Sequence, residues 1–306
     1  MQHDLITSLQ TRFSLSPEQV ENIKLQSIRE LISKQKSVKI PQLIIIGGQQ
    51  GSFKDDLQKV ALKEVSNNAL LLSKNELRKY HPNFAEMQSH YPDMLRVFTD
   101  DLAKTLLSNL ENEAIEKQLN VVLKASLVDF EKIAKKINLF KTNNFEIRVK
   151  ISAIHKMFSY LNSEENYERM LSEDKPASNI SKQHHDKNFE AIEATLNKLN
   201  QNELLDKVEL YKVKLLEKDG VFNTEIATLT SDKDKFMEVF TQERHRDFTD
   251  VEQIYLKDKA QKVLNQKTKR EANFLEKVRF DANTKFILEG KGMNGMRKEK
   301  TIKVED

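Results

Sequence analysis

Residues 43–57 read LIIIGGQQGSFKDDL and carry the strongest fold signal in the chain. Four apolar residues run into the pair Gly47 and Gly48, and Gly51 and Lys54 follow. A short continuous apolar run is typical of a strand buried on both faces of a parallel sheet. Glycines and a lysine between such a strand and a helix are typical of a loop whose backbone N–H groups hold phosphate. The stretch therefore predicts a strand, a phosphate loop and a helix.

Strand and helix patterns alternate along the chain after this loop. The predicted strands are 43–46, 69–72, 121–123, 145–151 and 208–213, and the predicted helices are 55–65, 93–118, 128–138, 153–172 and 181–200. Such alternation predicts an α/β fold with a mainly parallel, five-stranded sheet flanked by helices, of the P-loop kinase type. Residues 218–221, Lys-Asp-Gly-Val, predict a hairpin turn that closes the sheet region.

Both ends of the chain predict additional helices. Residues 16–19, Ser-Pro-Glu-Gln, form a capping-box pattern that opens a helix. Residues 231–288 contain no proline or glycine, and their apolar spacing predicts two long helices with Phe236, Phe240 and Tyr255 buried. The expected division is an N-terminal helical segment (1–40), a P-loop kinase domain (41–230), a C-terminal helical extension (231–288) and a mobile tail (289–306).

Composition excludes several classes of protein. The 306 residues include no cysteine, which excludes disulfides, thiol catalysis and cysteine-ligated zinc. No apolar run is long enough to span a membrane and no signal peptide is evident, so a cytoplasmic location is expected. A net charge of +3 is too balanced to predict nucleic-acid binding.

Three segments resemble the zeta toxins, which are bacterial phosphotransferases of toxin–antitoxin systems. Residues 76–84, ELRKYHPNF, resemble the stretch after the family's second strand. Residues 159–170 and 182–186 resemble two further segments in order and spacing. The resemblance covers roughly residues 40–215. It implies a kinase that uses ATP and magnesium to phosphorylate the 3′-hydroxyl of a UDP-activated amino sugar. It also implies a small helical antitoxin that restrains this kinase by blocking its ATP site.

The phosphate loop departs from the family's pattern. Gly48, Gly51 and Lys54 match it, but the last loop glycine is replaced by Phe53 and the magnesium-binding hydroxyl by Asp55. A bulky side chain then stands where the backbone approaches phosphate, and a negative charge stands beside it. The loop is therefore interpreted as vestigial, and no metal site is predicted.

The remaining catalytic positions that the resemblance implies are also altered. They are Asn75 at the base carboxylate, Lys124, Ser126 and Val128 in the family's Glu-Gly-Thr-x-Arg segment, and Asn166 and Ser178 at two arginines. Asparagine cannot act as the general base that a carboxylate provides. We also predict that Lys124 pairs with Asp55 or Asp56, where a metal ion would otherwise lie.

These losses predict a zeta-toxin-like pseudokinase that acts by binding or regulation and needs no cofactor. One alternative is an ATP- and magnesium-dependent UDP-N-acetylglucosamine kinase with residual or relocated activity. Another is a structural or interaction protein that uses its helical extensions. The expected partner is a protein such as a small helical antitoxin, with no role for membranes or nucleic acid.

Three histidine motifs are interpreted as structural. Residues 245–247, His-Arg-Asp, imitate a protein-kinase catalytic loop, but no Asp-Phe-Gly follows. Residues 184–186, His-His-Asp, hold adjacent histidines that diverge by about 100° on a helix, which disfavours a metal site. His81 is predicted to make a structural contact with the N-terminal part of the chain.

Overall fold

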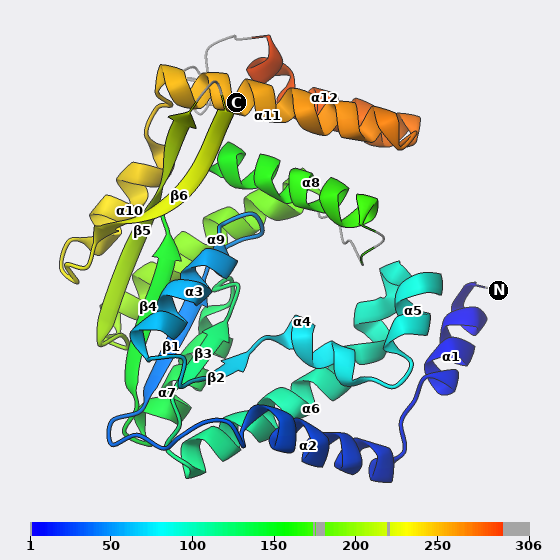
Figure 1. The fold of residues 1–306 in the computed structure, drawn as a ribbon, viewed down its shortest axis with the longest axis vertical. Coiled ribbons are helices and arrows are strands. Elements are labelled where there is room, and N and C mark those ends of the chain that lie inside the picture. The colour runs from blue at the N-terminus through cyan, green and yellow to red at the C-terminus, as the bar shows by residue number, and fades with distance from the viewer. Residues whose placement is uncertain (1, 174, 176–180, 219–220, 290–306) are drawn as a thin grey trace, which may run out of the picture. The chain divides into compact units, whose positions relative to one another are not determined.

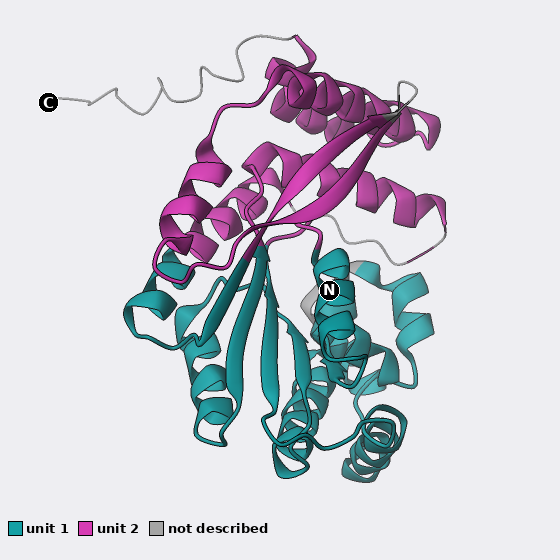
Figure 2. Ribbon diagram, turned by 60° about the vertical axis from the view of Figure 1, so that its left-hand side comes forward, with its two compact units in different colours: residues 1–48, 54–151, 194–209 teal, residues 49–53, 152–193, 210–306 magenta. Residues whose placement is uncertain are grey.

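The structure is a computed structural model that describes the whole chain except residues 1, 174, 176–180, 219–220 and 290–306. The chain forms two compact units, shown in Figure 2. Unit 1 comprises residues 1–48, 54–151 and 194–209, and unit 2 comprises residues 49–53, 152–193 and 210–306. The predicted tail lies almost entirely outside the described residues. Within the described part of the chain, no helix is long and apolar enough to cross a membrane.

The sheet has six strands in the order β2-β3-β1-β4-β5-β6 (Figure 1). The strands are β1 (Gln42–Gly47), β2 (Leu70–Leu72), β3 (Val121–Lys124), β4 (Glu146–Ser152), β5 (Lys207–Lys218) and β6 (Val221–Thr230). β1 is parallel to β3 and β4, and β2 is parallel to β3, so the predicted mainly parallel α/β class is confirmed. The prediction of five strands was wrong, because β6 returns antiparallel to β5. The centre of the turn between them, 219–220, lies outside the described residues.

Unit 1 contains the parallel part of the sheet. Its helices are α1 (Gln2–Arg12), α2 (Pro17–Leu31), α3 (Lys54–Glu64), α4 (Lys74–Leu77), η1 (Arg78–Tyr80), α5 (Phe84–His90), η2 (Pro92–Met94), α6 (Leu95–Glu116) and α7 (Phe130–Lys141). The predicted capping box at Ser16 is present in both halves, with Gln19 as its partner. Residues 43–46 of β1 are completely buried, as an apolar central strand requires.

Unit 2 contains the C-terminal helices. They are α8 (Lys156–Ser172), the first part of α9 (Lys182–Gln201), α10 (Phe236–His245), α11 (Asp250–Lys269) and α12 (Phe274–Leu288). Residues 231–288 thus form three helices, and the prediction of two was wrong. Thr249 and Glu252 make a capping box that starts α11, and Asn273 caps α12.

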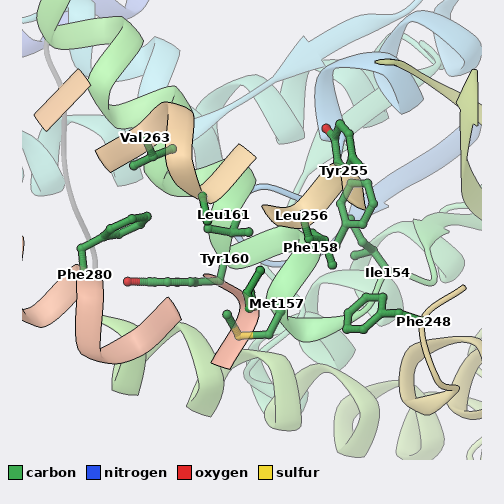
Figure 3. Close-up of a cluster of buried hydrophobic side chains, with 12 residues drawn as sticks. Ile154, Met157, Phe158, Tyr160, Leu161, Phe248, Tyr255, Leu256, Val263 and Phe280 are labelled. Carbon is green, nitrogen blue, oxygen red and sulfur yellow. The ribbon is translucent and has the colours of Figure 1, made fainter. Parts of the chain in front are cut away.

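An aromatic and aliphatic cluster holds α8, α11 and α12 together within unit 2 (Figure 3). Phe158 of α8 stacks on Tyr255 of α11, with ring centroids 5.1 Å apart. Phe236, Phe240 and Tyr255 are buried, which confirms that prediction. Loop residue Phe53 lies at the edge of this cluster.

Candidate functional site

The loop after β1 keeps the backbone geometry of a tight turn. Gly48 and Gly51 have φ angles of 136° and 76°, in a region that side chains with a Cβ rarely adopt. Helix α3 begins at Lys54, so the predicted order of strand, loop and helix is confirmed. Gly47 is closely covered by Leu127 after β3, whose side chain would lie 2.2 Å from a Cβ at that position. A larger residue at position 47 would therefore require the Leu127 side chain to move.

Phe53 occupies a backbone conformation that favours glycine. Its φ angle is 57°, in the left-handed region, which costs a residue with a Cβ roughly 1–2 kcal/mol. Its ring contacts Phe158 with a centroid separation of 6.3 Å. The resemblance assigns a glycine to this position, and the backbone retains the glycine-like conformation. The aromatic side chain is held by packing within unit 2.

Helix α8 contacts the loop closely within unit 2. A Cβ on Gly51 would lie 2.0 Å from the Ser159 carbonyl oxygen, so no larger residue fits there. The Asn162 amide donates to the Gly51 carbonyl at 3.0 Å, and the Gln49 amide donates to the Ser159 hydroxyl at 3.0 Å. The Ser152 hydroxyl donates to the Ser52 carbonyl at 2.6 Å. These hydrogen bonds and the close packing thereby hold loop residues 49–53 in place within unit 2.

A Ser–His–Asp arrangement, in which the serine and the histidine are buried, supports the contact between the loop and α8. The Ser159 hydroxyl lies 3.0 Å from His185 Nε2, and His185 Nδ1 lies 3.3 Å from Asp186 Oδ1. Ser159 and His185 are both completely buried. The Ser159 hydroxyl also lies 3.0 Å from the Lys156 carbonyl, so the group is engaged in packing and is not exposed as a nucleophile. No cluster of metal-binding side chains occurs among the described residues.

Unit 1 holds three charged groups at the start of α3 and the end of β3. Lys124 Nζ lies 2.5 Å from Asp55 Oδ1, which confirms the predicted contact. The Asp55 side chain is 84% exposed, however, so the pair is solvated. The Lys54 amine donates to the Gly48 carbonyl at 2.6 Å. Burial lowers the pKa of the Lys54 amine to about 8. The negative charge of Asp55 opposes this lowering, and the positive charge of Lys124 adds to it.

The other predicted positions do not form one cluster. Asn75 is exposed in unit 1 and accepts a hydrogen bond from Arg78 at 3.3 Å. Ser126 is exposed and Val128 is half-buried after β3. Asn166 is exposed on α8 in unit 2, where Arg169 donates to it at 3.3 Å. Ser178 lies outside the described residues.

A group of ion pairs next to Asn75 was not predicted. Asp100 of α6 accepts from Lys74 at 2.8 Å and from Arg78 at 2.5 Å, and Lys104 contacts its other oxygen at 2.9 Å. Burial of Asp100 opposes ionisation, but the lysine and arginine contacts prevail and lower its pKa to about 2. The one available sequence signal was Lys74, which lies two positions after the end of the short strand β2.

The histidine motifs have structural partners. His81 Nδ1 accepts from the Asn83 backbone at 3.2 Å, so Nε2 carries the proton and donates to the Phe13 carbonyl at 3.0 Å. This contact with the N-terminal region is the one predicted. His245 Nε2 lies 3.1 Å from a Glu193 oxygen in unit 2. Each of these histidines thus has a role in packing.

Comparisons with known proteins point to one family. The family model described as zeta toxin matches residues 28–237. Toxin PezT of Streptococcus pneumoniae is 24% identical over 188 residues, which cover 61% of this chain and 74% of that protein. Toxin zeta of Streptococcus pyogenes is 26% identical over 206 residues, which cover 65% of this chain and 69% of that protein.

A solved structure supports the same fold. It comes from a study of the PezAT chromosomal toxin–antitoxin system of Streptococcus pneumoniae. It aligns with a TM-score of 0.70 and 20% identity, and covers 83% of this chain and 98% of that chain. At this identity the likeness concerns the fold.

Proposed function

Since the chain belongs to the zeta toxin family, whose model matches residues 28–237, we propose that it is a pseudokinase. In this proposal it keeps the kinase fold and acts by binding or regulation, without transferring phosphate. The observation that carries the proposal is the 2.5 Å contact between Lys124 and Asp55. The resemblance assigns a carboxylate to position 124 and a magnesium-binding hydroxyl to position 55, and these two positions now hold an ion pair.

The residues at these positions do not fit a magnesium ion. Magnesium prefers oxygen ligands in a near-octahedral arrangement, and an ammonium group supplies no lone pair. Lys124 instead contributes a positive charge where the metal would contribute one. One of the two Asp55 carboxylate oxygens, Oδ1, is engaged with that ammonium. Magnesium-ATP should therefore bind poorly.

Three further replacements support the loss of phosphoryl transfer. Phe53 puts an aromatic ring at the last loop glycine, where backbone must approach phosphate. Asn75 removes general-base help that is typically worth about 10² to 10⁴ in rate. Asn166 replaces an arginine, a type of group that contributes on the order of 10³ to 10⁵ in related phosphoryl transfers.

One observation favours the alternative, a kinase with residual activity. Lys54 is retained at the start of α3, and Gly48 and Gly51 keep φ angles of 136° and 76°. A phosphate group could still meet backbone N–H groups at this helix start. In that case ATP and magnesium would be required, and the acceptor would be UDP-N-acetylglucosamine.

For the partner we propose a small helical antitoxin. Two relatives are named toxins, and one structural neighbour comes from a toxin–antitoxin study. Co-expression with the antitoxin of the PezAT system, followed by analytical ultracentrifugation, tests this. A stable complex supports the proposal, and separate sedimentation of the two proteins argues against it.

Calorimetry with ATP tests the pseudokinase proposal. For the unmodified chain, adding magnesium should change the ATP affinity by less than about twofold, because Lys124 already supplies the positive charge. The double variant Asp55→Thr, Lys124→Glu restores a hydroxyl and a carboxylate, and magnesium should then tighten ATP binding. The matched control is Asp56→Thr, Lys59→Glu, on the neighbouring pair 2.9 Å apart. Micromolar affinity of the unmodified chain for magnesium-ATP would contradict the proposal.

A further inference from the structure

Three lysines lie at the carboxyl ends of three neighbouring parallel strands in unit 1. Lys124 is the last residue of β3, Lys74 follows β2 by two positions, and Lys54 begins the helix after β1. The strands are adjacent in the order β2-β3-β1. In open α/β sheets, ligands bind outside the carboxyl ends of the strands. This edge therefore carries lysines where a ligand would bind, although Lys124 is paired there with Asp55.

Cations outnumber carboxylates near the end of β2. Lys74, Arg78 and Lys104 all contact Asp100, at 2.8, 2.5 and 2.9 Å. Lys104 also contacts Asp101 at 3.3 Å, but the Asp101 side chain is 98% exposed and strongly screened by water. Two carboxylates thus face three cations, and a net positive charge remains.

Arg78 carries a hydrogen-bond donor without a partner. Its side chain is 9% exposed, and its Nε is buried with no hydrogen-bond partner among the described residues. Burial lowers the pKa of the Arg78 guanidinium, Asp100 opposes that shift, and Arg96 adds positive charge nearby. A buried cation is unfavourable, and an anion bound at the exposed lysines of the same group would offset part of that cost.

We propose that the Asp100 cluster, defined as Lys74, Arg78, Lys104 and Asp100, binds a phosphate group of a small ligand without a metal ion. Lysine and arginine are the side chains that bind phosphate directly, arginine through two parallel N–H groups. The inference does not depend on whether phosphoryl transfer is lost, because it concerns binding alone.

Calorimetry with inorganic pyrophosphate in EDTA tests the site. The double variant Lys74→Gln, Lys104→Gln should weaken binding at least about tenfold, because it removes two charged hydrogen-bond donors. The matched control is Lys117→Gln, Lys141→Gln, which removes the same charge at the ends of α6 and α7, before β3 and β4 begin. The control should stay within about twofold of the unmodified chain.

A variant with the opposite effect separates binding from folding. Asp100→Asn removes the carboxylate that competes with the ligand, so pyrophosphate should bind several-fold more tightly, an effect that misfolding would not produce. Three results would overturn the proposal. They are no pyrophosphate binding by the unmodified chain at millimolar concentration, equal loss in both lysine double variants, and binding that requires magnesium.

Discussion

Replacing Phe53 separates two opposing contributions to stability at the loop, namely the burial of the ring and the strain of the left-handed backbone. In Phe53→Ala the left-handed strain remains and the ring is lost. Full burial of a phenylalanine is worth about 3–5 kcal/mol, and Phe53 is only partly buried at the cluster edge, so the loss should be about 2 kcal/mol. In Phe53→Gly the ring is also lost, but strain of roughly 1–2 kcal/mol is relieved. Glycine also has greater conformational freedom in the unfolded chain, which offsets about 0.5–1 kcal/mol of that gain in stability.

The glycine variant should therefore be more stable than the alanine variant by about 0.5–1 kcal/mol, although both are less stable than the unmodified chain. Urea unfolding with equal slopes measures this difference. Phe222 provides a matched control, because it contacts the same cluster from strand β6. There, alanine should be the more stable replacement. Equal or greater stability of Phe53→Ala would show that residue 53 is not held in the left-handed region.

Three further outcomes follow from the charges. Lys267→Met should cost about 3 kcal/mol of unfolding free energy, because it leaves the buried carboxylate of Glu168 with one cation fewer; a loss below about 1 kcal/mol would contradict this. Lys124→Gln should cost less than about 1 kcal/mol, since Asp55 is exposed, and a larger loss in the same urea assay would contradict that. Burial lowers the pKa of His155 to about 3, with smaller contributions from nearby cations, so the unfolded chain takes up a proton first as pH falls below about 6.5. This group should then lower the free energy of unfolding by at most about 1.4 kcal/mol per pH unit as pH falls. The variant His155→Asn keeps a capping oxygen, and its free energy of unfolding should fall less steeply between pH 6.5 and 4.5. The same pH dependence in the variant and the unmodified chain would refute the lowered pKa of His155.

The parts of the fold that rest on local signals could be predicted from the sequence. The apolar run of β1, the following glycines and the capping box at Ser16 each specify structure within a few residues. β6 was missed because its sequence, VFNTEIATLT, interrupts its five apolar residues with threonine, asparagine and glutamate, as suits a half-exposed edge strand. The break between α10 and α11 was missed although Thr249 and Glu252 form a recognisable capping box.

The site could be predicted only where it lies on the loop itself. The contact of Lys124 with Asp55 followed from the resemblance, which implies that these two positions approach the same phosphate and magnesium region. The exposure of Asp55 did not, because it depends on how surrounding elements cover the strand ends. The Asp100 cluster joins α4 and η1 to α6, with 22 to 30 positions between its members on the two sides, and no short sequence pattern links them.

Transfer of labelled γ-phosphate from ATP to UDP-N-acetylglucosamine, with magnesium present, tests the pseudokinase account most directly. The account predicts no labelled sugar nucleotide above the background of a sample without protein, because the general base, the metal ligands and an arginine are replaced together. A zeta toxin relative assayed in parallel confirms that the conditions support transfer. Labelled product that requires the chain and disappears in Lys54→Ala would contradict the account and establish the kinase alternative.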